Sequence, residues 1–138
     1  MVYHFVMDSI FTKIINGQIP AHYVAQEKDY VAFLDIHPIR PGHTLVVPKK
    51  QIGSYIDMSS GDFKDLMGAA QRIAKHIQVT LGCKRVVLNI DGSDTPDHVH
   101  IHLVPINNPE DSHREGRMEE EPDHDSLRQM AQRLILEN

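Results

Sequence analysis

The clearest hydrophobic pattern along the chain is a helical stripe in its middle. Between residues 59 and 82, apolar side chains recur every three or four positions, the period of an amphipathic helix with one buried face. Ser59 or Ser60 supplies an N-cap, and Gly82 supplies a C-terminal stop. The sequence therefore predicts one long helix packed against a core. Its apolar positions are Phe63, Leu66, Met67, Ala70, Ile73, Ala74, Ile77 and Leu81.

Two shorter stripes predict one helix towards each end of the chain. Ser9 is a candidate N-cap for a short helix that stops before Gly17. The apolar side of this helix is Ile10, Phe11, Ile14 and Ile15. The helix near the C-terminus is predicted from Leu127, Met130, Ala131 and Leu134.

Five segments rich in β-branched and aromatic residues are typical of strands. Lys28 and Asp29 fit a tight turn between the first two strands, and short connections of this kind favour antiparallel pairing. We therefore predict an α+β fold, in which a five-stranded antiparallel sheet carries the long helix on one face, with a short N-terminal helix and a C-terminal helix. The predicted strands are residues 23–27, 30–36, 43–47, 85–90 and 98–106.

Composition and charge narrow the class of protein. The chain has 138 residues, which fits one domain, and it contains no run of about 20 apolar residues that could span a bilayer. Cys83 is its only cysteine, so we expect no disulfide and a cytoplasmic location. Residues 110–125 carry a net charge of −6, which leaves +1 for the rest. This balance argues against a nucleic acid polymer as partner. The acidic segment is either a solvated loop or a docking surface for a basic partner.

Three histidines, His98, His100 and His102, stand together in the last predicted strand. Ten histidines spread evenly over 138 residues would place fewer than one in a five-residue window. Because side chains alternate faces along a strand, all three imidazoles are expected on one face, about 6.6 Å apart at each step. Val99 and Ile101 then face the core. Folding alone gives no reason to line one face of a strand with titratable rings.

Two kinds of chemistry compete for this row of histidines. Neutral imidazoles are common ligands of zinc and iron, so the row predicts a metal site. Alternatively, one imidazole nitrogen attacks phosphorus or carbon while its neighbours orient it. The spacing does not separate these interpretations, and a plain solvent-facing strand would more naturally carry Thr, Lys or Glu.

The row and several other segments resemble the histidine triad family. Residues 98–104 read His-Val-His-Ile-His-Leu-Val, which is similar to the family signature of three histidines that alternate with apolar residues. Residues 9–14 resemble the first helix of the family, and residues 32–36 with 41–48 resemble its central strand, loop and strand. The resemblance covers roughly residues 8–106 in the right order.

The resemblance implies a hydrolase or nucleotidyl transferase that acts on the α-phosphate of a nucleoside 5′-phosphate derivative. Candidate substrates are a phosphoramidate, an aminoacyl adenylate and a dinucleoside polyphosphate. His100 matches the family nucleophile, which forms a covalent nucleotidyl-histidine intermediate that water then cleaves. His102 matches the histidine that contacts the phosphate and helps the leaving group. His98 matches the member behind these two, and His43 matches a fourth histidine that orients the triad.

The resemblance also implies substrate-binding residues. Asp35 matches the acid that accepts hydrogen bonds from the ribose, and Asn89 matches an asparagine on the phosphate side. Thr95 stands near the place where many members carry a Ser or Thr hydroxyl. The apolar positions that sandwich the base are Ile10, Phe11, Ile14, Ile19 and Leu45. Structural roles are the alternative, because Asp35 also fits a turn residue, and Phe11 and Ile14 also fit an ordinary core.

The chain departs from the family at one metal site. Ser9 and Thr12 stand where many bacterial relatives carry the Cys-x-x-Cys of a structural zinc site. We therefore expect no zinc there, no cofactor, and catalysis that does not need a metal. The alternatives from other classes are a metal-binding or sensor module built on the three-histidine row, and a protein that binds nucleotide without hydrolysing it.

The resemblance to the family also divides the chain into segments and predicts the partners of the protein. Residues 1–8 are interpreted as an N-terminal extension in which Met7 is a second candidate start. Residues 9–106 form the family domain, and residues 107–138 form an acidic loop and a C-terminal helix of that domain. The family implies a homodimer. We expect a small nucleotide as the partner, and neither a nucleic acid polymer nor a membrane.

Overall fold

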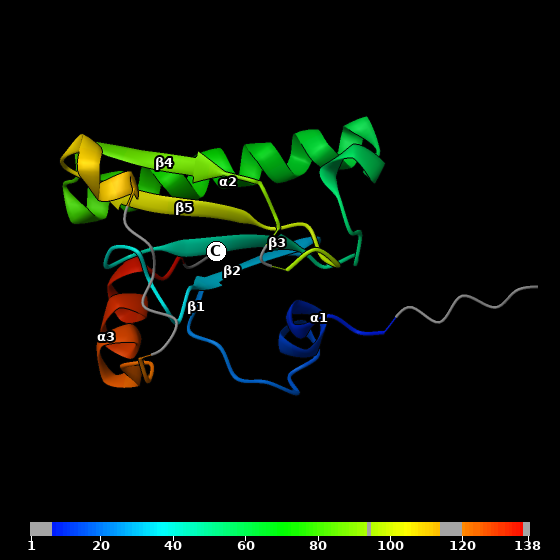
Figure 1. The fold of residues 1–138 in the computed structure, drawn as a ribbon, viewed down its shortest axis with the longest axis horizontal. Coiled ribbons are helices and arrows are strands. Elements are labelled where there is room, and N and C mark those ends of the chain that lie inside the picture. The colour runs from blue at the N-terminus through cyan, green and yellow to red at the C-terminus, as the bar shows by residue number, and fades with distance from the viewer. Residues whose placement is uncertain (1–6, 94, 114–119, 137–138) are drawn as a thin grey trace, which may run out of the picture.

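The computed structural model describes residues 7–93, 95–113 and 120–136. They form one antiparallel sheet with the strand order β1-β2-β3-β5-β4, flanked by helices (Figure 1). The predicted α+β fold is therefore confirmed. The strands are β1 (Tyr23–Gln26), β2 (Tyr30–Leu34), β3 (Thr44–Pro48), β4 (Arg85–Asn89) and β5 (Ile101–Ile106). The helices are α1 (Ile10–Ile15), α2 (Ser60–Leu81) and α3 (His124–Leu134), with 3₁₀ turns η1 (Tyr55–Asp57) and η2 (Pro109–His113).

The sheet is buried on both faces at its centre. Along β3, Val46 belongs to the core on one face, whereas Leu45 and Val47 belong to the core on the other. The first core is closed by α2 and α3 and contains Val99, Ile101 and Leu103, as the alternation predicts. The second core is smaller and is closed by α1 through Phe11 and Ile14. The histidine row therefore lies on the same side of the sheet as α1.

The predicted helix signals are confirmed by their hydrogen bonds. The Ser59 hydroxyl accepts the amide hydrogen of Asp62 at the start of α2, and Gly82 ends the helix with a positive φ of 67°. The Ser9 hydroxyl caps α1 in the same way. Leu134 of α3 is buried in the same core as α2. None of the helices in the described ranges is long and apolar enough to cross a membrane.

The strand prediction is wrong at three ends that matter for the site. β2 ends at Leu34, before Asp35, and β3 begins at Thr44, after His43. β5 begins at Ile101, so His98 and His100 precede it instead of lying in it. Ladder pairing between β3 and β5 reaches only Val46 opposite Ile101. Residues 98–100 diverge from that ladder, and the Val99 amide donates to the Ile52 carbonyl at 2.7 Å. The alternating sequence pattern continues through the row and β3 itself runs on to Pro48, but the pairing between β3 and β5 does not continue.

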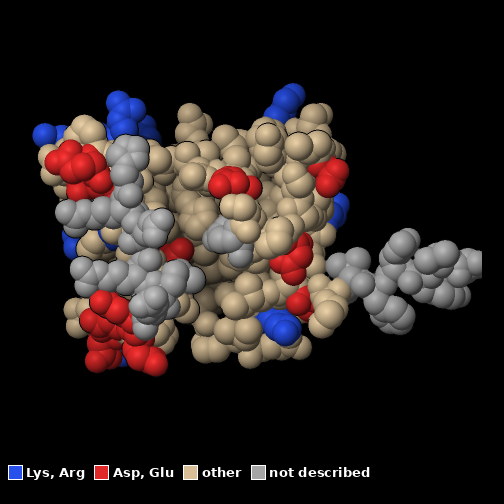
Figure 2. Space-filling model, viewed as in Figure 1, with Lys and Arg blue, Asp and Glu red and all other residues tan. Residues whose placement is uncertain are grey.

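Charged side chains are distributed unevenly over the surface. Figure 2 shows acidic side chains gathered over the start of α3. Glu120, Glu121, Asp123 and Asp125 of this region are exposed. The two interpretations of the acidic segment both remain predictions. Residues 114–119 of the segment, and residues 1–6 of the expected N-terminal extension, lie outside the described residues.

Candidate active site

His98 is buried between the start of α1 and the end of β3. Its Nε2 lies 2.8 Å from the Pro48 carbonyl oxygen, and its Nδ1 lies 2.6 Å from Ser9 Oγ. A carbonyl oxygen only accepts, so the ring hydrogen is on Nε2 and Nδ1 accepts from the Ser9 hydroxyl. Burial lowers the pKa of His98 below its ordinary value. The ring is therefore held neutral and in one tautomer.

His100 is fixed by the backbone of its own segment. Its Nδ1 lies 2.8 Å from the His98 carbonyl oxygen, so Nδ1 carries the hydrogen and the lone pair is on Nε2. The Phe11 ring packs edge-on against the imidazole at a centroid distance of 4.9 Å, and the His102 ring lies 5.0 Å away. The tautomer fixed in this way has its lone pair on Nε2, the nitrogen remote from the backbone, which is the form that a nucleophile requires.

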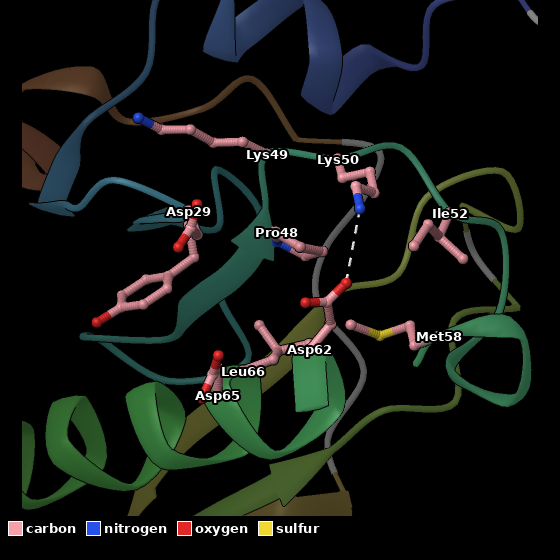
Figure 3. Close-up of a pocket in the computed structure, with 10 residues that line it drawn as sticks. Asp29, Pro48, Lys49, Lys50, Ile52, Met58, Asp62, Asp65 and Leu66 are labelled. Carbon is pink, nitrogen blue, oxygen red and sulfur yellow. Dashed lines mark ion pairs between the residues drawn. The ribbon is translucent and has the colours of Figure 1, made fainter. Parts of the chain in front are cut away.

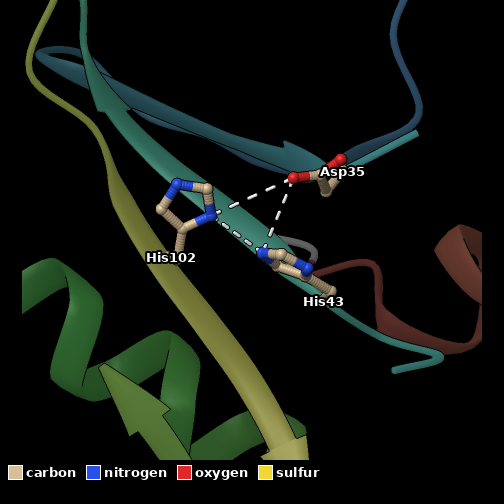
Figure 4. A group of neighbouring side chains, drawn as sticks. All are labelled: Asp35, His43 and His102. Atoms are coloured by element: carbon tan, nitrogen blue, oxygen red, sulfur yellow. Dashed lines mark hydrogen bonds and ion pairs between the residues drawn. The ribbon is translucent and has the colours of Figure 1, made fainter. Parts of the chain in front are cut away.

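His43, His102 and Asp35 converge at the ends of β2 and β3 (Figure 4). The Ile39 amide donates to His43 Nδ1 at 3.1 Å, which places the hydrogen of the neutral ring on Nε2. This Nε2 lies 2.9 Å from His102 Nδ1, so His43 donates and His102 keeps its own hydrogen on Nε2. Asp35 Oδ2 lies 3.6 Å from His43 Nε2 and 3.9 Å from His102 Nδ1. Asp35 Oδ1 accepts the His37 amide at 2.8 Å.

The same three side chains have the composition of a metal site. Ligand atoms of Asp35, His43 and His102 all lie within 4.8 Å of one another. A metal-bound imidazole normally donates its second N–H to an acceptor. In His43 the second nitrogen instead accepts from the Ile39 amide, so binding through Nε2 would require a ring without hydrogens. In the alternative three-histidine set, both nitrogens of His98 are already bonded. The hydrogen bonds favour a relay of imidazoles over a metal centre.

A line of paired residues across the sheet explains how residues that are distant in sequence come to lie beside His102. Phe33 of β2 lies opposite Leu45 of β3, Leu45 lies opposite His102 of β5, and His102 lies opposite Asn89 of β4. Directly opposed residues share a face of the sheet, so this line of paired residues brings apolar side chains, an imidazole and an amide together. Asn89 is exposed, and its Oδ1 accepts the Asp91 amide at 2.7 Å.

Most of the apolar residues that are expected to contact the base of the nucleotide lie beside the histidines. Phe11, Ile14 and Leu45 are buried in one cluster, and Ile19 packs against it. Ile10 is 51% exposed and lies outside that cluster. Thr95 lies in the loop between β4 and β5, where its amide bonds to the Gly92 carbonyl in the same loop at 3.3 Å.

Two hollows border the site without containing the row. A pocket of about 410 Å³ lies beyond Pro48, and Lys50 Nζ approaches Asp62 Oδ2 at 3.6 Å across it (Figure 3). A second pocket, of about 360 Å³, lies between α3 and the loop after β2, and Asp35 and His43 contribute to its wall. Asp35 and His43 therefore border a hollow on the side of α3.

Sequence reasoning missed five contributors to this site. Ser9 is expected only as a helix cap, and Gln51 lies in a loop without a motif, yet both belong to the hydrogen-bonded surroundings of His98. The backbone groups of Ile39 and Pro48 set the tautomers of two histidines and leave no trace in the sequence pattern. Phe33 was within reach, because it shares the alternation of β2 with Asp35.

Comparison with known proteins agrees with this geometry. A family model described as the HIT domain matches residues 16–108. The adenosine 5′-monophosphoramidase HNT1 of Saccharomyces cerevisiae is 33% identical over 129 residues, covering 91% of this chain and 80% of the yeast protein. An uncharacterized HIT-like protein of Methanocaldococcus jannaschii is 34% identical over 99 residues, covering 70% of this chain and 77% of its own length.

Solved structures show the same likeness. A HIT-like protein of Bartonella henselae superposes with a TM-score of 0.78 at 27% identity, covering 92% of this chain and 94% of its own. A zinc-bound histidine triad protein of Mycobacterium smegmatis has a TM-score of 0.73 at 26% identity, covering 91% and 92%. The matched family model spans the sheet, α2 and the histidine row. The chain therefore belongs to the histidine triad (HIT) family.

Proposed function

We propose that this protein hydrolyses the α-phosphate linkage of a nucleoside 5′-phosphate derivative through a covalent nucleotidyl-His100 intermediate. The observation that carries the proposal is the hydrogen bond from His100 Nδ1 to the His98 carbonyl, which places the ring hydrogen on Nδ1 and the lone pair on Nε2. Membership of the HIT family supports a nucleotide hydrolase. The relative named as an adenosine 5′-monophosphoramidase makes adenosine 5′-phosphoramidate the first substrate to test.

The first step forms a bond between His100 Nε2 and the α-phosphorus and breaks the bond to the leaving group. The leaving atom takes the electron pair of the broken bond. A protonated amine departs as a neutral amine, and a carboxylate or polyphosphate departs as an anion, so none of these groups needs a full proton from the enzyme. A hydrogen bond from His102 Nε2 is then sufficient help, and His43 keeps His102 in the tautomer that can donate it.

The second step releases the nucleotide. Water attacks the phosphorus, the electron pair of the P–N bond returns to His100 Nε2, and the second hydrogen of the water leaves as a proton. Splitting one displacement into two lowers the barrier of each. Since His100 has no exposed surface, attack requires the side chains around its ring to make room for the phosphate.

The remaining site residues take supporting roles in this proposal. The Asp35 carboxylate accepts hydrogen bonds from the ribose hydroxyls, and Asn89 lies beside His102 on the phosphate side. The cluster around Phe11 and Leu45 contacts the base. Catalysis uses no metal, and the places of Ser9 and Thr12 hold no zinc. The role of Thr95 rests on the family resemblance. A cytoplasmic location also stays a prediction.

We also propose that the protein is a homodimer. β4 forms one edge of the described sheet, and Leu88 on it is 40% exposed. Val79 on the neighbouring helix α2 is 74% exposed. Pairing two β4 edges would satisfy their open backbone groups and cover these side chains. Light scattering of the purified protein tests this, and a Val79→Glu variant that stays dimeric at low concentration would place the interface elsewhere.

The function is tested by trapping the intermediate. Wild-type protein mixed with adenosine 5′-phosphoramidate and quenched during the first turnover should carry one nucleotidyl group on the peptide that contains residues 98–102. His100→Ala should lose the adduct and several orders of magnitude in kcat. His124→Ala, which removes an exposed histidine, serves as the matched control. Absence of the adduct from wild type during active turnover would refute the covalent route.

A further inference from the structure

A partly buried polar cluster lies next to His98, where α1 begins. Gln51 Oε1 accepts both the Ser9 amide, at 2.9 Å, and the Thr12 hydroxyl, at 2.7 Å. The Gln51 amide nitrogen in turn donates to the Met7 carbonyl at 2.9 Å. The Thr12 amide donates to Ser9 Oγ at 2.9 Å, and Ser9 itself is only 1% exposed. Three polar side chains from two segments are thus bonded to one another and to His98.

The hydroxyl hydrogens of this cluster can be assigned from their acceptors. The single hydrogen of the Thr12 hydroxyl is used on Gln51 Oε1. The single hydrogen of the Ser9 hydroxyl has two acceptors in reach, Thr12 Oγ1 at 3.2 Å and His98 Nδ1 at 2.6 Å. His98 Nδ1 carries no hydrogen, because the ring donates through Nε2 to Pro48, so the shorter bond takes the Ser9 hydrogen. Within the cluster, the Ser9 hydroxyl is therefore the donor to the His98 ring. Gln51 Oε1 holds the Ser9 amide, and the Thr12 amide donates to Ser9 Oγ, so both residues keep Ser9 in place.

The bond from Ser9 to His98 matters because residues 98–100, which include the nucleophile, are not paired in the ladder with β3. Residues 98–100 precede β5, and the ladder with β3 stops at Ile101. The segment is instead held by the Val99 amide bond to Ile52 and by the two bonds of the His98 ring. The His98 carbonyl then receives His100 Nδ1–H at 2.8 Å. The orientation of the nucleophile thus depends on how firmly the His98 ring is anchored.

We propose that Ser9, Thr12 and Gln51 are positioning residues of the nucleophile: they anchor His98, and through its carbonyl they hold His100 with Nε2 towards the phosphate. The inference rests on the proposed role of His100. Removing the Ser9 hydroxyl leaves the buried Nδ1 with only Thr12 Oγ1 in reach, at 3.4 Å, and the hydrogen of that hydroxyl is used on Gln51. The residue 98–100 segment then loses one of its ties. A misplacement of about 1 Å at a reacting atom costs up to roughly a hundredfold in rate.

The test compares two hydroxyls that cap two helices. Ser9→Ala removes the cap of α1 together with the bond to His98. Ser59→Ala removes the cap of α2, where the hydroxyl accepts from the Asp62 amide. We expect Ser9→Ala to lower the single-turnover rate with adenosine 5′-phosphoramidate by at least about tenfold, with an unchanged Kd for AMP. Ser59→Ala should stay within about twofold of wild type, and Ser9→Thr, which keeps a hydroxyl, should recover most of the rate.

A second readout does not depend on turnover. In protein labelled with ¹⁵N-histidine, the His100 Nδ1 hydrogen should give a protected NMR signal, which should exchange at least about tenfold faster in Ser9→Ala and not in Ser59→Ala. If neither wild type nor any variant hydrolyses the substrate, but the Nδ1 hydrogen still exchanges faster in Ser9→Ala only, the proposed function fails and the positioning network stands. A wild-type rate and signal in Ser9→Ala, or an equal loss in Ser59→Ala, would overturn the network. Should Ser9→Ala not fold, Thr12→Val and Gln51→Leu test the same cluster with the α1 cap intact.

Discussion

The contact between Asp35 and the ribose is the part of the nucleoside assignment that can be measured most directly. The carboxylate lies at the end of β2, where one oxygen accepts the His37 amide at 2.8 Å and the other faces His43 Nε2 at 3.6 Å. The side chain is 20% exposed, so a ligand can reach it. A carboxylate offers about four acceptor directions, which allows it to take a sugar hydroxyl while it keeps the backbone bond.

The expected size follows from the strength of a charged hydrogen bond. Such a bond contributes about 1.5–3 kcal/mol, and about 1.4 kcal/mol corresponds to tenfold in rate. A 2′-deoxy substrate should therefore show a kcat/KM that is lower by about tenfold or more. Asp35→Asn can place an amide N–H opposite His43 Nε2, which is itself a donor. Because two donors then face each other, the variant should lower the rate with both sugars. This common loss cancels in the ratio of the two substrates, and the ratio itself should shrink by at least about threefold.

The assay is a four-way comparison of ribo and 2′-deoxy substrates with wild type and Asp35→Asn. Asp65→Asn, an exposed acid on α2, is the control that changes the same charge without touching the site. Base identity should matter less than the sugar, because Phe11 and Leu45 offer apolar contact without a hydrogen-bond code. Equal rates for the two sugars in wild type would make Asp35 a turn residue. An unchanged ratio in Asp35→Asn would assign the discrimination to another group.

Three further outcomes are expected. Treatment with EDTA should leave the rate of hydrolysis within about twofold, and a collapse that Zn²⁺ restores would favour the metal interpretation. Burial lowers the pKa of both His98 and His22 from the ordinary 6.5, so the unfolded chain binds more protons. The contribution of these two histidines to the free energy of unfolding should therefore be present above about pH 6.5 and be lost as the pH falls below it. Equal urea midpoints at pH 5 and pH 7.5 would contradict this. Gly42 has a φ of 94°, and an added Cβ would lie 2.7 Å from Leu81 Cδ1. Gly42→Ala should thus cost about 2–5 kcal/mol in urea unfolding, against little or no loss for Gly61→Ala, where nothing lies within 4 Å.

The elements that the sequence predicts well are those whose burial is periodic. α2 buries Leu66, Ile73 and Ile77 on one side, so its stripe is visible without knowing what covers it. The row of histidines is visible for the same reason, because Val99 and Ile101 between them face the core. The start of β5 was misplaced, because a strand also needs a partner, and no pattern within residues 98–106 shows where β3 stops pairing.

The sequence by itself determined the sheet-and-helix composition of the fold, the family and the identity of the four histidines. Tertiary structure alone decided what those histidines can do. The tautomer of an imidazole depends on which nitrogen meets a donor and which meets an acceptor, and here the partners include the Ile39 amide, the Pro48 carbonyl and the Ser9 hydroxyl. These groups are far from the row in sequence, and two of them belong to the backbone that every residue shares. Residue type therefore indicates where an imidazole stands, whereas only the folded chain fixes which of its nitrogens holds a lone pair.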